Sequence, residues 1–270
     1  MTNYLAESRI RDGLSRVSYF RNIAGPGPGI CTVCRQPTTT EVCGACQHIH
    51  KALEGLTCDH TFFLAYIDGR HPQEYAQSAK TMRQYKAQPA ARRSVEDVQL
   101  LTNNMTWIHD ECIREAEGDA EWDVVTFVPS RTKRPGIHPV AEIARNVARI
   151  VEDDPERGGF SRMKRRQMAI GPVDAPRTAN PDRFAVTGPV FNNARVLLVD
   201  DTWTGGTSVQ SAAAALKLAG AASVTALCVG RWLSWKWLPH VPLLEKVTAQ
   251  PYDPFRCIAF KRICPAPGAD

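Results

Sequence analysis

The segment Arg195–Ser208, which reads RVLLVDDTWTGGTS, constrains the fold of this chain more than any other. Its apolar run Val196–Val199 suits a short strand that is buried on both faces of a sheet. Asp200 and Asp201 follow directly, and after a glycine turn an alanine-rich helix is expected at Val209–Ala219. A strand, an acidic pair, a glycine turn and a helix in this order predict an α/β fold with a parallel sheet flanked by helices. They also predict a ligand site at the carboxyl end of the strand.

The turn has the composition of an anion-binding loop. Gly205 and Gly206 have no Cβ, so the backbone can wrap closely around an anion and direct several N–H groups at it. The N-terminus of the following helix adds partial positive charge. Hydroxyl donors are supplied by Thr204, Thr207 and Ser208. Together these features predict a phosphate-binding turn.

The two acids narrow the class of ligand. The turn lacks the lysine of a Walker loop, and it does not have the G-x-G-x-x-G spacing of a dinucleotide turn. Carboxylates as close to the turn as Asp200 and Asp201 would repel a polyphosphate, so we expect them to accept hydrogen bonds from sugar hydroxyls. A phosphate and a vicinal diol that are held side by side describe a ribose 5-phosphate.

At these residues the sequence resembles the type I phosphoribosyltransferases. Their signature for phosphoribosyl pyrophosphate (PRPP) is a hydrophobic strand, two acids and a Thr/Gly-rich loop, as in Val196–Ser208. The resemblance implies that Asp200 and Asp201 hold the ribose 2- and 3-hydroxyls and that Thr204–Ser208 holds the 5-phosphate. It also implies a Mg²⁺-dependent transfer of the 5-phosphoribosyl group to a nitrogen acceptor, with release of pyrophosphate.

Four cysteines form a second strong pattern. Cys31-x-x-Cys34 is followed after eight residues by Cys43-x-x-Cys46, and two such knuckles complete a tetrahedral sulfur shell for zinc. Because cysteine fills all four positions, we expect a closed, structural zinc site whose metal drives folding of a small zinc-ribbon module. Four nearby residues are left out of the predicted ligand set: His48, His50, Cys58 and His60.

The remaining elements are predicted from apolar patterning. Strands are expected at Thr61–Ile67, Asp123–Val128 and Ser223–Val229, and Asn180–Val186 is expected to lead into the same sheet. Helices are expected at Asn3–Ile23, Gln73–Ala87, Ser94–Glu117 and Pro139–Ile150, the third of them capped by Ser94.

A basic loop follows the expected strand Asp123–Val128. It reads PSRTKRPG and brings Arg131, Lys133 and Arg134 to the carboxyl end of that strand, where cations can meet a pyrophosphate. Ser130 adds a hydroxyl beside them, and Lys86 ends the expected helix Gln73–Ala87 with a further cation.

The order of these features resembles the ComF family of competence-associated, zinc-ribbon phosphoribosyltransferase-like proteins, over about Cys31–Arg231. The resemblance implies that Pro129–Arg134 is the pyrophosphate loop and that Lys86 is the family's basic helix end. Where the family has R-G-F-N, this chain reads RPGIH from Arg134, a departure that favours PRPP binding over turnover. The candidate catalytic residues are Asp200, Asp201, Lys86 and Arg131, and the candidate ligand-binding residues are Ser130, Lys133, Arg134, Thr204, Gly205, Gly206, Thr207 and Ser208.

The net charge, the apolar runs and the cysteine content limit which ligands and which compartment suit the protein. The net charge of +5 fits an anionic small ligand and permits nucleic acid without requiring it. No apolar run reaches about 18 residues, so we expect no membrane span. The N-terminus lacks the apolar core of a secretory signal, and nine clustered cysteines do not suit a disulfide framework, so a reducing cytoplasm is expected.

The chain divides into four expected segments. They are an N-terminal helix at 1–24, a zinc module at 30–60, a phosphoribosyltransferase-like domain at 61–245 and a tail at 246–270. The N-terminal helix suits a structural or oligomer-packing role, such as a homodimer contact. In the tail, Cys257 and Cys264 are spaced too loosely to predict a second metal site, and no partners for them are apparent.

Two functional interpretations remain open, beside a third in which the protein is a scaffold that binds no ligand. One is an enzyme that transfers the phosphoribosyl group to an unidentified acceptor. A purine-salvage reaction is disfavoured, because Thr204 stands where those enzymes carry an aspartate. Glutamine-dependent amide transfer is also disfavoured, because no cysteine follows Met1 to act as an N-terminal nucleophile. The other is a silent PRPP sensor, or a DNA-uptake type of protein, that meets DNA or another protein through its zinc ribbon. The basic segment Gly158–Arg166 fits a mobile loop over the site, a solvated charge run or a nucleic-acid patch.

Overall fold

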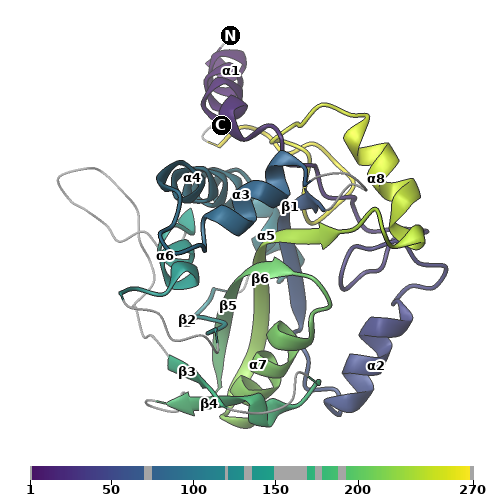
Figure 1. Ribbon diagram of the computed structural model, residues 1–270, viewed down its shortest axis with the longest axis vertical. Helices are drawn as coiled ribbons and strands as arrows, with labels where there is room; N and C mark the ends of the chain where they lie inside the picture. Colours follow the sequence, from purple (N-terminus) through teal and green to yellow (C-terminus); the bar gives the residue numbers. More distant parts are fainter. Residues whose placement is uncertain are drawn as a thin grey trace.

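The computed structural model describes residues 2–69, 75–118, 121–130, 136–148, 169–173, 178–187 and 193–267. Within these residues, a parallel sheet of four strands forms the centre of the molecule, in the order β1-β6-β5-β2 (Figure 1). The strands span His60–Asp68 (β1), Ala221–Leu233 (β6), Ala194–Trp203 (β5) and Val124–Phe127 (β2). The expected α/β fold class is therefore confirmed.

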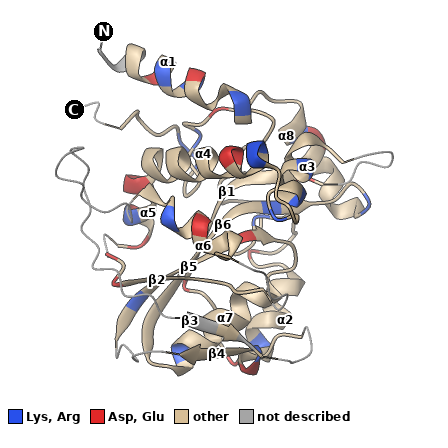
Figure 2. Ribbon diagram, turned by 60° about the vertical axis from the view of Figure 1, so that its left-hand side comes forward, with Lys and Arg blue, Asp and Glu red and all other residues tan. Residues whose placement is uncertain are grey.

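The strands are buried on both faces, as their near-continuous apolar sequences predict. Successive side chains of a strand point to opposite faces of the sheet. In β5, Leu197 and Val199 therefore belong to one apolar cluster, and Val196 and Leu198 belong to the other. Figure 2 shows the strands mostly without charge and the charged residues mainly on helices and loops. Parallel strands with this pattern need helices on both faces.

One face of the sheet is covered by helices from the N-terminal half and by the C-terminal segment. Their apolar residues share a cluster with the sheet, and this cluster includes Leu14 near the N-terminus and Phe255 near the C-terminus. The two ends of the chain lie on the same side of the molecule (Figures 1 and 2). The helices are α1 (Thr2–Leu14), α3 (Gln77–Gln84), α4 (Arg92–Ile108), α5 (Asp110–Ala116) and α6 (Pro139–Arg145).

The other face is covered by α7 (Thr207–Leu218), α8 (Val241–Thr248) and the cysteine module with α2 (Gly44–Ala52). Buried alanines of α7, including Ala212 and Ala213, lie in the apolar cluster of this face together with Val196. None of the helices in the described segments has the length and apolar character needed to cross a membrane.

Four expectations about elements are wrong. The acids do not follow β5 but lie within it, because β5 continues to pair with β6 through Asp200–Cys228 and Thr202–Gly230. Ser94 does not cap a helix. It lies inside α4, where its hydroxyl donates to Gln84 Oε1 at 3.1 Å.

The expected helix Ser94–Glu117 is two helices, α4 and α5, which meet at His109. The segment after Asn180 does not join the main sheet either. It forms β4 (Phe184–Thr187), which pairs antiparallel with β3 (Ala169–Pro172) in a separate small sheet. The predicted division of the chain into four segments stays a prediction.

Candidate functional site

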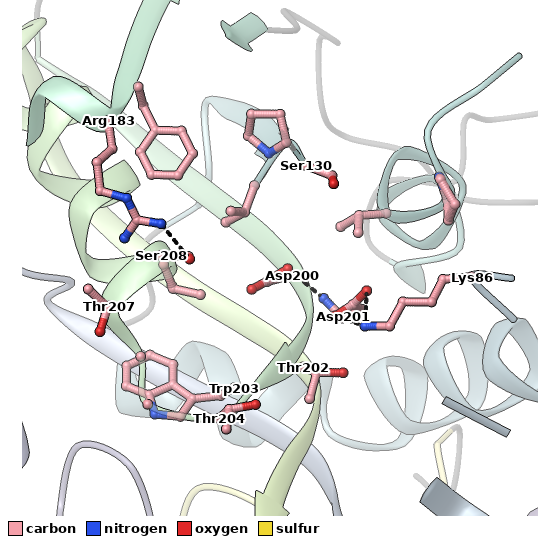
Figure 3. Close-up of a pocket in the computed structure, with 18 of the residues that line it drawn as sticks. Lys86, Ser130, Arg183, Asp200, Asp201, Thr202, Trp203, Thr204, Thr207 and Ser208 are labelled. Atoms are coloured by element: carbon pink, nitrogen blue, oxygen red, sulfur yellow. Dashed lines mark hydrogen bonds and ion pairs between the residues drawn. The ribbon is translucent and has the colours of Figure 1, made fainter. Parts of the chain in front are cut away.

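The carboxyl ends of β2 and β5 meet at one edge of the sheet, because these strands are paired in parallel up to Phe127 and Val199. A cavity of about 540 Å³ opens there. It lies at the position where open α/β sheets bind ligands, and its volume suits a small molecule. The polar residues lining it include Lys86, Ser130, Arg183, Asp200, Asp201 and the turn Thr204–Ser208 (Figure 3).

Asp200 lies at the centre of the cavity wall, between the Ser208 turn and Asp201 (Figure 3). One of its oxygens accepts the backbone N–H of Asp201 at 2.9 Å. Burial of the carboxyl group and repulsion by the neighbouring Asp201 raise the pKa of Asp200 well above its usual range. When two carboxyl groups lie this close, the charge on one disfavours ionisation of the other. A hydroxyl donor or a cation beside them would stabilise the ionised pair.

Asp201 is held by two side chains from the end of α3. Lys86 Nζ lies 3.2 Å from Asp201 Oδ2 in an ion pair, and the Tyr85 hydroxyl donates to the same oxygen. Only 14% of the Asp201 side chain is exposed. The Tyr-Lys helix end therefore reaches the acidic pair, although the two lie more than a hundred positions apart in the sequence.

The turn after β5 depends on Gly206. This residue has φ of 82°, in the left-handed region, and a Cβ built on it would lie 2.2 Å from the Trp203 ring. The ring is buried beneath the turn and forms its floor. α7 then begins at Thr207, so its first N–H groups are directed at the cavity, where an anion can accept them.

Arg183 brings a buried cation to the same turn. Its guanidinium donates to Ser208 Oγ at 3.1 Å, and the residue is only 8% exposed. It comes from the 3₁₀ turn Pro181–Arg183, which precedes β4. Sequence reasoning missed Arg183, because no local pattern marks one arginine in a polar segment as a partner of a turn 25 positions away.

The β2 side of the cavity is described only in part. Ser130 lines the cavity, and its backbone N lies 3.0 Å from His138 Nε2. His138 Nδ1 accepts the N–H of Val140 at the start of α6, which fixes the ring beside the cavity. The predicted pyrophosphate residues Arg131, Lys133 and Arg134 lie outside the described residues, as does the basic segment 158–166.

The arrangement can recognise a ligand that carries both an anion and hydroxyl donors. Backbone N–H groups, hydroxyls and the Arg183 guanidinium converge on one end of the cavity, where they favour negative charge. Asp200 and Asp201 offer acceptors beside them. Carboxylate oxygens also suit Mg²⁺, which takes oxygen ligands and is usually bound together with substrate phosphates.

No protein-family model and no curated protein matches this chain. Two crystal structures of a hypoxanthine phosphoribosyltransferase from Staphylococcus aureus are similar to it, with 12% and 11% identity and TM-scores of 0.31 and 0.32. The similarity covers 53% and 52% of this chain and 77% and 75% of those chains. A phosphoribosyltransferase from Corynebacterium diphtheriae is similar with 20% identity and a TM-score of 0.26, over 57% of this chain and 91% of that one. Because these TM-scores lie below 0.5, the proposed function depends on the geometry of the site.

The four predicted metal ligands, Cys31, Cys34, Cys43 and Cys46, come together in one buried cluster. Their sulfur atoms all lie within 4.8 Å of one another, and the Cys34 and Cys43 sulfurs are 3.7 Å apart. Two sulfurs on a tetrahedral zinc ion are separated by about 3.8 Å. The cluster can therefore hold a structural metal such as zinc, with every ligand position filled by cysteine.

Buried arginines beside this cluster fit a negatively charged metal–thiolate centre. Arg35 is 7% exposed, and its Nε and Nη1 atoms have no hydrogen-bond partner among the described residues. Arg231 is 2% exposed and donates to the Cys34 carbonyl oxygen at 2.7 Å. Four thiolates around a divalent ion carry excess negative charge, which offsets the cost of burying these cations.

Arg231 also connects the metal module to the ligand cavity. Beyond the Cys34 carbonyl, it donates to the Thr204 carbonyl oxygen at 2.8 Å and to Gln36 Oε1 at 2.8 Å. Sequence reasoning missed this role, because the arginine lies within the apolar strand β6 and its partners are in two other segments. It holds the turn that begins the anion-binding site against the cysteine knuckle.

The structure supplies partners for Cys257 and Cys264 that were not apparent in the sequence. His109, at the junction of α4 and α5, and Cys112 meet them in a second buried cluster whose ligand atoms lie within 4.8 Å of one another. The spacing within the tail carried no signal, because half of the cluster comes from the α4–α5 corner.

Proposed function

We propose that the cavity binds PRPP and that the protein transfers its 5-phosphoribosyl group to a nitrogen acceptor. One observation carries the proposal: the connection from β5 to α7 places two carboxylates and an anion-binding turn side by side on the same cavity. The pairing matches a ligand with a phosphate next to a vicinal diol. The order of the cysteine module, the Tyr-Lys helix end and this strand–turn–helix segment along the chain also supports a relationship to the ComF family.

In this proposal the turn Thr204–Ser208 and the first N–H groups of α7 bind the 5-phosphate. The Arg183 guanidinium, which donates to Ser208 Oγ, adds positive charge next to the phosphate. Asp200 and Asp201 accept hydrogen bonds from the ribose 2- and 3-hydroxyls. The raised pKa of Asp200 shows that the ligand-free site disfavours the ionised carboxylate. A hydrogen bond donated by a ligand hydroxyl would favour the ionised form, so this raised pKa fits a binding site for hydroxyl donors.

The reaction breaks the bond from ribose C1 to the pyrophosphate oxygen and forms one from C1 to the acceptor nitrogen, which loses a proton. The leaving group carries the electron pair, so positive charge near the pyrophosphate lowers the barrier. Lys86 is placed for this task beside Asp201, and we propose that Ser130, Arg131, Lys133 and Arg134 face the same group. Mg²⁺ bound near Asp200 and Asp201 would neutralise further charge on the phosphates.

Calorimetric titration with PRPP, with and without Mg²⁺, tests the binding half of the proposal. Asp200→Asn combined with Asp201→Asn should abolish binding while leaving the fold and the zinc content intact. Glu7→Gln combined with Asp12→Asn, two changes on the distant helix α1, is the charge-matched control and should bind PRPP normally. Unchanged affinity in the Asp200/Asp201 variant would show that the ribose assignment is mistaken.

Pyrophosphate release tests the catalytic half. PRPP and Mg²⁺ are supplied with a panel of nucleobases and amines, and release above the acceptor-free background supports transfer. If PRPP binds but no acceptor produces pyrophosphate, the enzyme reading fails and the pocket belongs to a PRPP-sensing protein. Salt-dependent DNA affinity would then indicate that the zinc module meets nucleic acid.

A further inference from the structure

The second cysteine cluster lies between the α4–α5 corner and the C-terminal segment, and none of its residues lines the ligand cavity. It contains His109, Cys112, Cys257 and Cys264, all of them buried, with exposed fractions of 5% or less. From this convergence we propose a second metal site, a closed zinc centre with three cysteines and one histidine. The inference is independent of the proposed function.

The separations within the cluster fit a tetrahedral ion. Cys112 Sγ lies 3.7 Å from His109 Nδ1, and all four ligand atoms lie within 4.8 Å of one another. A sulfur and a nitrogen bound to one tetrahedral zinc ion are about 3.6 Å apart, and two sulfurs about 3.8 Å. A small contraction of the cluster around the ion completes the coordination.

The orientation of His109 is that of a ligand. Its Nε2 lies 3.0 Å from the Pro254 carbonyl oxygen, so this nitrogen carries the proton and donates it. Nδ1 is then the unprotonated nitrogen, and it is the one that faces Cys112 Sγ. Histidines that bind metals commonly donate their second N–H to a backbone carbonyl, which fixes both tautomer and ring.

The C-terminal loop has the form of a metal knuckle. Cys257 N–H donates to the Arg262 carbonyl at 3.0 Å and Cys264 N–H to the Phe255 carbonyl at 2.7 Å, so the loop closes on itself with both cysteines at its base. Phe260 N–H donates to Cys257 Sγ at 3.2 Å. In the first cluster Cys43 N–H donates to Cys31 Sγ at 3.3 Å in the same manner. Such bonds favour a thiolate over a thiol.

The ligand count decides between a metal and a disulfide. A disulfide would use two of the three cysteines and leave the third thiol and the histidine nitrogen facing it, whereas all nine cysteines here are free. Three thiolates and one imidazole fill a tetrahedral zinc shell without an open position. The site is therefore structural: it ties the C-terminal segment to the corner where α4 ends and α5 begins.

The test is the number of zinc ions per chain in the full-length protein, measured by native mass spectrometry and by elemental analysis. Wild-type protein should carry two. Cys264→Ser should carry one, and Cys34→Ser, in the other cluster, should also carry one. Cys58→Ser is the matched control, because Cys58 is a half-buried cysteine outside both clusters, and it should keep two.

One zinc per wild-type chain would overturn the proposal, and so would two zinc ions in Cys264→Ser. The wild-type measurement needs no variant to fold. X-ray absorption of the zinc-loaded wild-type protein adds a second readout: a sulfur shell with a minor nitrogen contribution supports the site, and an all-sulfur shell contradicts it. A mass that is two hydrogens lower without reductant would indicate a disulfide and would also overturn it.

Discussion

Gly206 is the residue on which the shape of the anion-binding turn most directly depends. Its φ of 82° is unfavourable for an L-residue, and a Cβ would overlap the buried Trp203 ring. We expect Gly206→Ala to destabilise the protein by about 2–3 kcal/mol, as typical for strain combined with a steric overlap, and to weaken PRPP binding. Urea denaturation and calorimetry measure the two effects.

The adjacent glycine provides a matched control for this prediction. A Cβ at Gly205 would meet nothing closer than Thr207 Oγ1 at 3.9 Å, and its φ lies outside the left-handed region. Gly205→Ala should therefore change the free energy of unfolding by no more than about 0.5 kcal/mol. Equal losses in the two variants would show that the turn does not depend on the left-handed position.

Asp200 should make stability depend on pH. Its folded-state pKa is raised by burial and by Asp201, so between the unfolded value, about 3.9, and the raised value the folded state binds more protons than the unfolded state. Stability of the ligand-free protein should therefore fall as pH rises through this range.

Asp200→Asn removes that dependence, because the amide does not titrate. The variant should be more stable than wild type by about 1 kcal/mol near neutral pH, with a smaller difference in acid. Denaturant midpoints at about pH 5 and about pH 8 measure the difference. A gap that stays constant with pH would show that Asp200 titrates normally.

Among the elements, β6 carries the connection between the metal module and the ligand cavity through Arg231. Arg231→Met keeps much of the side-chain volume but leaves the carbonyls of Cys34 and Thr204 without their donor. We expect a loss of about 3 kcal/mol in the free energy of unfolding, because these are buried bonds to a charged group.

The same change should weaken PRPP binding, since the loop at Thr204 loses its anchor. Arg195→Met, at an arginine of β5 with 44% of its side chain exposed, is the control and should lie within about 0.5 kcal/mol of wild type. A loss of stability without any loss of affinity would limit Arg231 to a role in the core.

The elements that could be predicted from sequence are those whose signal is local. The apolar run Val196–Val199 determined a buried strand, and the glycine turn with its acids located the cavity, because both depend on neighbours in the chain. The break at His109 could not be predicted, since the apolar pattern continues through it. The His109 ring at this break contacts the Pro254 carbonyl, 145 positions away, and the sequence gives no sign of that contact.

The same limit applies to the site. Arg183, Tyr85 and Arg231 act on the cavity through contacts that only the folded chain creates. The four-cysteine module was predictable because both knuckles lie within one short segment. The second cluster was not, because a close pair from the α4–α5 corner meets a pair from the C-terminal loop.

For the molecule as a whole, the C-terminal segment forms part of the central core. Phe255 is 1% exposed and shares an apolar cluster with Leu64 of β1 and Leu227 of β6. Arg11 in α1 lies over its ring and also pairs with Asp253 at 2.7 Å, so the two ends of the chain pack together. If this packing is integral to the core, loss of the ring should destabilise the sheet itself.

Phe255→Ala should lower the free energy of unfolding by about 3–5 kcal/mol, the usual cost of deleting a buried aromatic ring. The loss should appear as one shifted transition in both far-UV circular dichroism and tryptophan fluorescence, because Trp203 and Trp122 are buried in the same molecule. Leu238→Ala, at a residue that is 80% exposed, is the control and should leave the midpoint nearly unchanged. An early transition that leaves the sheet signal at its wild-type midpoint would instead mark the segment as a separately unfolding appendage.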